Sequence, residues 1–516
     1  MPKDNTRDLK ELIQNLNKAE KRNFNLFLKG RAGGKELHYG QLFEALNKPG
    51  KFNPDNFLKK HPHIKAEQLS NLKISLYDHL LESLRQQTVR KDVDLQIREK
   101  MDYASVLYNK GLLKQSRQML QKVTRLAERY HLDELRFEVL YREKIIELHF
   151  SGNNSLDLAT SLRMEAENSA RQIERINAFA GFGLQMHAHF VEKGYLENED
   201  DIAALKRFYE KSLPRFFSGD MSFNERFYYY RAQYWYYYVQ QDFLKSYRYS
   251  RLAETLIRDQ QLEHHRPVIY LKTLNQLLNS LFRMNEVRRF LDVLTQLEEF
   301  SLSLKRNPSD NESLLLFRIL SHHRINAAFM TGDFERGVSL IEDIQQGVAF
   351  WGNRLESRNI ITLNYKFACL YFGVGQYDRA LYFLNQIIHQ DDLTYRQDIH
   401  GYARILRLVT LYEQGEVDFL FSNIRATYQY FIRMRNLDPF HQEILSFLRR
   451  TTRYYPQMIH SEFDKLRQRM EQIAEDPLAR KPFYYFDIIS WLASQVKKVP
   501  VASVIRERGL GHQELF

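Results

Sequence analysis

The strongest constraint in this sequence is a turn that recurs at nearly constant spacing between segments with helical periodicity. Successive turns are 40 to 47 residues apart, and apolar residues flank each of them at helical intervals. The turns are expected at Gly111, Gly152, Gly194, Gln241, Asn285, Gly332, Gly375 and Gly415. A hairpin of two amphipathic helices cannot bury all its apolar surface alone, so it needs neighbours of the same shape. The spacing therefore predicts an array of helical hairpins, with the helix register at Gly152 and Gly194 left open.

The composition favours an all-α chain. Only 21 Gly and 12 Pro occur among 516 residues, and no series of alternating β-branched runs is bounded by turn dipeptides, which argues against a sheet. The single cysteine, Cys369, excludes an intrachain disulfide and a cysteine-rich zinc site. The sequence has no apolar run of about 18 residues and no apolar core near its start, so we expect a cytoplasmic protein without a membrane span.

Three regions are predicted along the chain. Residues 1–92 form an N-terminal helical module with helices near 8–29, 39–46 and 65–85, residues 93–476 form the hairpin array, and residues 477–516 form a C-terminal capping helix and a basic tail. The net charge of +11 is concentrated at the ends: residues 1–100 hold 20 basic and 13 acidic side chains, and residues 477–516 hold 6 and 3. Such an excess suits a solvated basic face, and it also suits an acidic partner or nucleic acid.

The unit around Gly375 resembles a tetratricopeptide repeat. Ala368, Tyr371, Gly375, Tyr377 and Ala380 stand at the positions that the hairpin of that family uses. The resemblance implies an α-solenoid whose first helices line a concave groove for a protein or peptide segment. Two departures are present: the spacing of 40 to 47 residues exceeds the family repeat of about 34, and acidic residues at 391 and 392 stand where a proline commonly closes the unit. Longer helices, or a related solenoid of helix pairs, remain open alternatives.

The groove positions implied by this resemblance lie 3, 6, 10 and 13 residues before each turn, because these steps share one helix face. Asparagine offers a donor and an acceptor to an extended peptide backbone, arginine and lysine suit a carboxylate, and tryptophan suits an apolar anchor. The predicted partner-binding residues are Tyr228, Arg231, Trp235, Lys272, Asn275, Asn279, His322, Asn326 and Tyr365.

The aromatic segment 223–251 contains the runs Tyr228-Tyr229-Tyr230 and Tyr234-Trp235-Tyr236-Tyr237-Tyr238 on one predicted helix. A helix that is apolar on every side is buried on several sides, whereas tyrosine hydroxyls need water or a partner. One interpretation is an inner helix whose hydroxyls reach solvent at its rims. The other is that some of the rings form the floor of the predicted groove.

No motif predicts a catalytic, metal or cofactor site. The segment 30–36, GRAGGKE, lacks the leading glycine and the hydroxyl residue of a phosphate-binding loop. The histidine pairs at 61/63, 187/189, 264/265 and 322/323 lack the spacing of four that places two ligands on one helix face. Nucleophile, base and oxyanion donors converge in no stretch of the sequence.

We therefore expect a non-enzymatic scaffold that binds a protein or peptide segment in the concave groove of a helical repeat array, without a cofactor. One alternative is a peptide-responsive regulator in which residues 1–92 are the output module. Another is association with nucleic acid through the basic ends, which would weaken steeply with salt.

Overall fold

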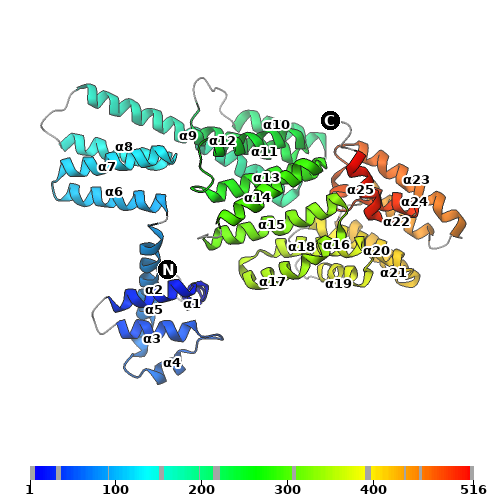
Figure 1. The fold of residues 1–516 in the computed structure, drawn as a ribbon, viewed down its shortest axis with the longest axis horizontal. Coiled ribbons are helices and arrows are strands. Elements are labelled where there is room, and N and C mark those ends of the chain that lie inside the picture. The colour runs from blue at the N-terminus through cyan, green and yellow to red at the C-terminus, as the bar shows by residue number, and fades with distance from the viewer. Residues whose placement is uncertain are drawn as a thin grey trace. The chain divides into compact units, whose positions relative to one another are not determined.

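The computed structural model is all-helical over the residues it describes, which are 6–30, 36–90, 92–149, 156–196, 198–212, 221–304, 309–389, 397–434, 437–451 and 456–511. The described residues contain no β-strand. The chain forms two compact units, residues 1–170 and 171–516, and helix α9 (Leu156–Lys193) contains the boundary between them (Figure 1). The prediction of an all-α protein is confirmed.

The first unit contains two groups of helices, each with its own buried apolar cluster. The first group has short helices and one long one: α1 (Thr6–Asn15), α2 (Lys18–Lys29), α3 (Glu36–Asn47), α4 (Pro54–Lys60) and α5 (Ala66–Thr88). The second group has three helices of equal length: α6 (Val93–Asn109), α7 (Leu113–Arg129) and α8 (Asp133–His149).

The single helix predicted over residues 8–29 is wrong, since the structure has two helices there. Asn17 caps α2: its Oδ1 accepts from the backbone N–H of Glu20, and the Glu20 carboxylate accepts from the backbone N–H of Asn17. This reciprocal capping box satisfies two helix-end donors and starts a new helix at Lys18. The apolar periodicity continues across the break, so periodicity alone predicts one helix. The GRAGGKE segment lies mostly outside the described residues.

The second unit consists of helices packed mainly in consecutive pairs. After α9 come α10 (Glu199–Ser212), α11 (Phe223–Val239), α12 (Phe243–Asp259), α13 (Pro267–Met284), α14 (Val287–Leu304), α15 (Asp310–Thr331), α16 (Phe334–Ser339), α17 (Ile341–Trp351), α18 (Ser357–Gly373), α19 (Tyr377–Ile388), α20 (Gln397–Gln414), α21 (Val417–Met434), α22 (Pro439–Thr451), α23 (Pro456–Glu475), α24 (Ile488–Lys497) and α25 (Val501–Gly511). The first helix of one pair also packs on the first helix of the next: α13 on α15, α15 on α18, α18 on α20 and α20 on α22 (Figure 1).

The predicted turn residues adopt the left-handed conformation wherever the structure describes them. Their φ angles are positive at Gly111, Gly194, Gln241, Asn285, Gly332, Gly375 and Gly415, while Gly152 lies outside the described residues. A left-handed residue after the last helical turn reverses the chain and satisfies free carbonyls. The sequence therefore placed these chain reversals correctly, including the two at residues other than glycine.

Small residues stand five positions after four of the turns, where they allow close helix packing. Ser116, Ser246, Gly337 and Ala380 are all buried. The Ser246 hydroxyl lies 2.9 Å from that of Ser280 in the neighbouring helix α13, and a methyl group added to Gly337 would overlap with Leu370.

The polar segment 305–312, KRNPSDNE, has the composition of a loop, but its last three residues belong to α15. Ser309 Oγ accepts from the backbone N–H of Glu312, and the Ser309 N–H donates to the Glu312 carboxylate, so α15 begins at Asp310. Residues 305–308 lie outside the described residues. As at Asn17, a capping box sets the start of the helix.

The C-terminal segment 481–511 contacts several hairpins of the second unit. It holds a short 3-10 helix (Lys481–Tyr484) as well as α24 and α25, where the sequence predicted one helix and a tail; residues 512–516 are outside the described part. Arg283 donates to the Tyr484 carbonyl oxygen at 2.9 Å, and Arg506 donates to that of Gly332 at 3.1 Å. The segment therefore does more than cover the last hairpin.

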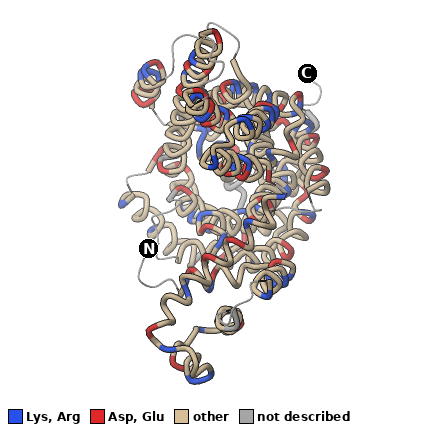
Figure 2. The backbone as a smooth tube through the Cα atoms, turned by 90° about the vertical axis from the view of Figure 1, so that its left-hand side faces the viewer, with Lys and Arg blue, Asp and Glu red and all other residues tan. Residues whose placement is uncertain are grey.

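No helix in the described part of the chain has the length and apolar character needed to cross a membrane. Basic and acidic residues are interspersed along the helices (Figure 2).

Candidate binding surface

The predicted partner-binding residues lie on four helices of the second unit. Helix α11 carries Tyr228, Arg231 and Trp235, α13 carries Lys272, Asn275 and Asn279, α15 carries His322 and Asn326, and α18 carries Tyr365. Lys272 is exposed and most of the others are half-buried. Asn326 and Tyr365 are each only 4% exposed, so these two side chains have little surface to offer a partner.

Four basic side chains, Arg231, Lys272, Arg318 and Arg358, form what we call the basic cluster. They come from α11, α13, α15 and α18 respectively. Although much of the Lys272 side chain is exposed, partial burial, followed by the charges of Arg231 and Arg318, lowers its pKa. Burial also lowers the pKa of Arg318, and Arg358 lowers it further. Mutual effects of this kind require charges close together in a partly desolvated setting, so the cluster concentrates positive charge.

Only one carboxylate, Glu356, opposes the basic cluster among the groups that shift these pKa values. It forms an ion pair with Arg358 and raises the pKa of Arg318 against the effect of burial. Within the described residues, Nε of Arg318 is buried and has no hydrogen-bond partner. The cluster therefore has donor capacity that its own chain does not use.

His187 of α9 and Trp235 extend this surface on its aromatic side. Their ring centroids are 4.5 Å apart. Burial lowers the pKa of His187, and Arg231, Arg358 and Lys272 lower it further. The imidazole therefore lies within electrostatic range of the basic cluster and, near neutral pH, is predominantly uncharged.

Two of the three predicted asparagines, Asn275 and Asn326, belong to a hydrogen-bond chain that links three helices. Asn275 Oδ1 of α13 lies 2.9 Å from Nε2 of His323 in α15, and Asn326 Nδ2 lies 3.4 Å from the other ring nitrogen, Nδ1. Lys366 of α18 donates to Asn326 Oδ1 at 2.6 Å and to the His322 carbonyl oxygen at 3.1 Å. Asn275 and Asn326 thus hold helices together, so substituting either would change the fold as well as any binding.

The hydrogen-bond chain requires a neutral imidazole at His323. We therefore expect the stability of the protein to depend on pH. Burial, and then the Lys366 charge, hold the pKa of His323 well below its ordinary value of 6.5. As the pH falls through 6.5, the unfolded chain binds a proton at His323 and the folded chain does not. The contribution of neutral His323 to the free energy of unfolding is therefore fully present above pH 6.5 and is lost as the pH falls below it. We expect the free energy of unfolding to fall by up to about 1.4 kcal/mol per pH unit below that value.

Urea denaturation between pH 7.5 and 5.5 measures this slope. The variant His323→Gln should flatten the slope, whereas His460→Gln, which changes an exposed histidine, should leave it as in the wild type. Equal slopes for the wild type and His323→Gln would contradict the assignment.

Helix α11 carries a network of aromatic contacts. Tyr234 is fully buried and Tyr238 is 4% exposed, and the Tyr195 hydroxyl donates to that of Tyr238 at 3.2 Å. Tyr228 and Trp235 keep partial exposure. Of the ten aromatic side chains of α11, five are buried and five are partly exposed. That some of these rings form the floor of a groove stays a prediction.

Sequence reasoning missed His187, Arg318, Arg358 and Lys366. A signal for two of them was available, because Arg318 stands four residues before His322 and Arg358 stands four before Thr362 on the predicted stripes. Extending the stripe before Gly375 by one helical turn would have included Arg358, and widening the stripe before Gly332 by one residue would have included Arg318. His187 and Lys366 lie off the counted positions, and only the packing of neighbouring helices brings them to this surface.

The lone cysteine is part of the packing near this surface. Burial raises the pKa of the Cys369 thiol to about 12, so it stays protonated at neutral pH. A nucleophilic cysteine needs a lowered pKa and access. Cys369 has a raised pKa instead, so it does not have the properties of a nucleophilic cysteine.

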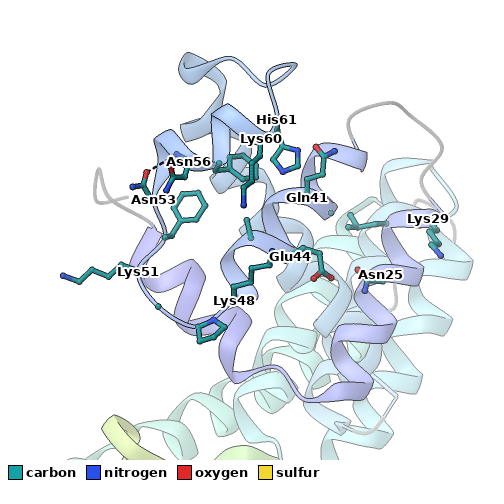
Figure 3. A pocket seen from close by; sticks show the side chains of 17 residues that line it. Asn25, Lys29, Gln41, Glu44, Lys48, Lys51, Asn53, Asn56, Lys60 and His61 are labelled. Atoms are coloured by element: carbon teal, nitrogen blue, oxygen red, sulfur yellow. Dashed lines mark hydrogen bonds between the residues drawn. The ribbon is translucent and has the colours of Figure 1, made fainter.

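A pocket of about 880 Å³ lies in the first unit, between α2, α3 and α4 (Figure 3). Four lysines line it, at positions 29, 48, 51 and 60, and Glu44 is the acidic residue among its described lining. Lys51 extends away from the other side chains (Figure 3). Part of the basic excess at the N-terminal end is thus gathered around one concavity.

Comparisons with known proteins give the chain no family assignment. No family model matches it, no curated protein matches it, and no solved structure matches it. The tetratricopeptide resemblance of the Gly375 unit therefore stays a prediction, and what the chain does must be argued from its own residues.

Proposed function

We propose that this protein is a non-enzymatic scaffold that binds an acidic protein or peptide segment on the basic cluster of its second unit. The observation that carries the proposal is the gathering of Arg231, Lys272, Arg318 and Arg358 from four helices with one opposing carboxylate. Like charges held together in a partly buried place disfavour one another. An acidic segment would relieve that repulsion and occupy the unused donors.

The helix order supports a surface long enough for an extended segment. The basic cluster draws one side chain from each of α11, α13, α15 and α18, and α13, α15 and α18 pack on one another in that order. We propose that these helices form the inner wall of a tetratricopeptide-like solenoid. On that wall, Trp235 and Tyr228 would receive an apolar side chain and the basic residues would pair with carboxylates.

Charge reversal in the basic cluster tests the proposal. The probe is a fluorescein-labelled peptide of 15 residues with alternating glutamates and one central leucine, followed by fluorescence anisotropy at 150 mM salt. We expect the double variant Lys272→Glu/Arg318→Glu to weaken binding at least tenfold, since two pairing cations become repulsive. The matched control is Arg288→Glu/Arg289→Glu, which reverses two exposed arginines of α14.

Equal loss in the two double variants would mean nonspecific charge attraction and would contradict the site. Absence of binding to the wild type would contradict the proposal itself. The regulator alternative would show as altered hydrogen exchange in residues 6–90 when peptide is added. The nucleic-acid alternative would show as single-stranded DNA binding that depends on Lys48 and Lys60 at the pocket of the first unit and not on the basic cluster.

A further inference from the structure

A second concavity of about 420 Å³ lies elsewhere in the second unit, among α19, α20 and α21. Its polar lining includes Arg404 and Arg407 of α20 and Arg433 of α21, together with Tyr430 and Thr427 of α21. None of the residues of the basic cluster lines this pocket. It is therefore a separate feature of the same unit.

The charge of this pocket is one-sided. Three arginines line it, and its described lining contains no aspartate or glutamate. Burial lowers the pKa of Arg404; Tyr430 opposes this effect, and the charges of Arg433 and Arg407 add to it. Both neighbouring guanidinium groups therefore act on Arg404. An enclosed surface of this kind is favourable for an anion.

Two of the arginines are held by their surroundings and one is left with unused capacity. Arg404 stacks on Tyr430, with its guanidinium carbon 3.9 Å from the ring centroid, and donates to the His400 carbonyl oxygen at 2.9 Å. Arg433 lies 6.0 Å from the same ring. Within the described residues, Nε of Arg407 is buried and has no hydrogen-bond partner. A buried donor without a partner is costly unless a ligand supplies the acceptor.

We propose that this pocket binds a phosphate monoester. Guanidinium groups pair with two oxygens at once, and a phosphate dianion has enough terminal oxygens for several such donors, whereas one carboxylate has two. The volume exceeds that of a phosphate ion alone, so the pocket has room for the group that carries the phosphate. Ile388, Leu408 and the Tyr430 ring give that group an apolar wall.

Calorimetric titration of the full chain with phenyl phosphate and with a phosphotyrosine peptide tests the proposal and distinguishes a small monoester from a phosphorylated protein. We expect at least one probe to bind with 1:1 stoichiometry, while benzoate and the unphosphorylated peptide do not. Arg407→Gln should weaken that binding at least tenfold. Arg425→Gln removes the same charge from an exposed position of α21 outside the pocket and should leave binding unchanged.

A stability measurement separates a ligand site from a structural role. Without phosphate compounds, Arg407→Gln should unfold at the same temperature as the wild type or higher, because it relieves repulsion among the arginines. With phosphate compounds, only the wild type and Arg425→Gln should gain stability. Lack of binding by both probes, or equal weakening in Arg407→Gln and Arg425→Gln, would overturn the proposal. The acidic-peptide site can fail without affecting this result, since the two sites share no residue.

Discussion

Gly332→Ala should destabilise the second unit by about 2–4 kcal/mol, the sum of two separate effects. Gly332 has a φ of +64°, where an alanine is strained, and its new Cβ would lie 2.7 Å from the backbone oxygen of Ala502 in α25. A backbone atom cannot rotate away as a side chain can, so α25 must shift. Urea denaturation gives the free energy of unfolding, and hydrogen exchange of residues 501–511 reports whether α25 loosens.

Gly415→Ala is the matched control for this change. Gly415 has a similar positive φ of +74°, but a Cβ there would meet nothing within 4 Å. It should therefore lose only the conformational part, about 1–2 kcal/mol, and leave the exchange of α25 unchanged. Equal destabilisation of the two variants, with no change at α25, would show that the C-terminal segment is not seated on this turn.

Glu413→Ala should also release the C-terminal segment, at a cost of about 1–3 kcal/mol for the donors it leaves without an acceptor. The Glu413 carboxylate accepts at one oxygen from Trp491 Nε1 at 2.6 Å and from the Gln495 amide at 2.7 Å. Trp491 is 2% exposed, so its indole N–H cannot turn to water. The free energy of unfolding should fall, and the fluorescence of Trp491 should shift to the red in a Trp235→Phe/Trp351→Phe background.

Glu413→Gln separates the loss of an acceptor from the loss of a charge. An amide oxygen in the same place can still accept from Trp491, so this variant should retain most of the stability. Burial raises the pKa of Glu413, although the hydrogen bonds from Trp491 and Tyr377 oppose the shift. Removing the charge therefore carries no large electrostatic penalty, and a Gln variant as unstable as the Ala variant would contradict the acceptor role.

The turns and caps were the features that local sequence could predict, because their physical basis is local. A left-handed residue at Gly332 or Asn285 ends a helix through its own backbone. Ser222 and Glu225 have the sequence spacing of a capping box, and that capping box starts α11. The same logic was available at Asn17 and Glu20. There the continuous apolar periodicity outweighed the capping signal, and a helix boundary was missed.

The candidate surface was predictable only in part. Counting back from the turns identified Arg231 and Lys272, since residues on one face of one helix are fixed by its period. It could not show that Asn275 and Asn326 bond to His323 and Lys366, because those partners come from neighbouring helices whose rotation is set by packing.

The sequence by itself determined that this chain is helical, where most of its helices reverse, and which small residues permit close packing. The tertiary structure decided that basic side chains from four helices gather in one cluster, that three arginines share a pocket, and that residues 481–511 return to hairpins far away in sequence. The physical reason is range: caps, turns and periodicity act within a few residues, whereas charge clustering and long-range contacts depend on how separate helices pack.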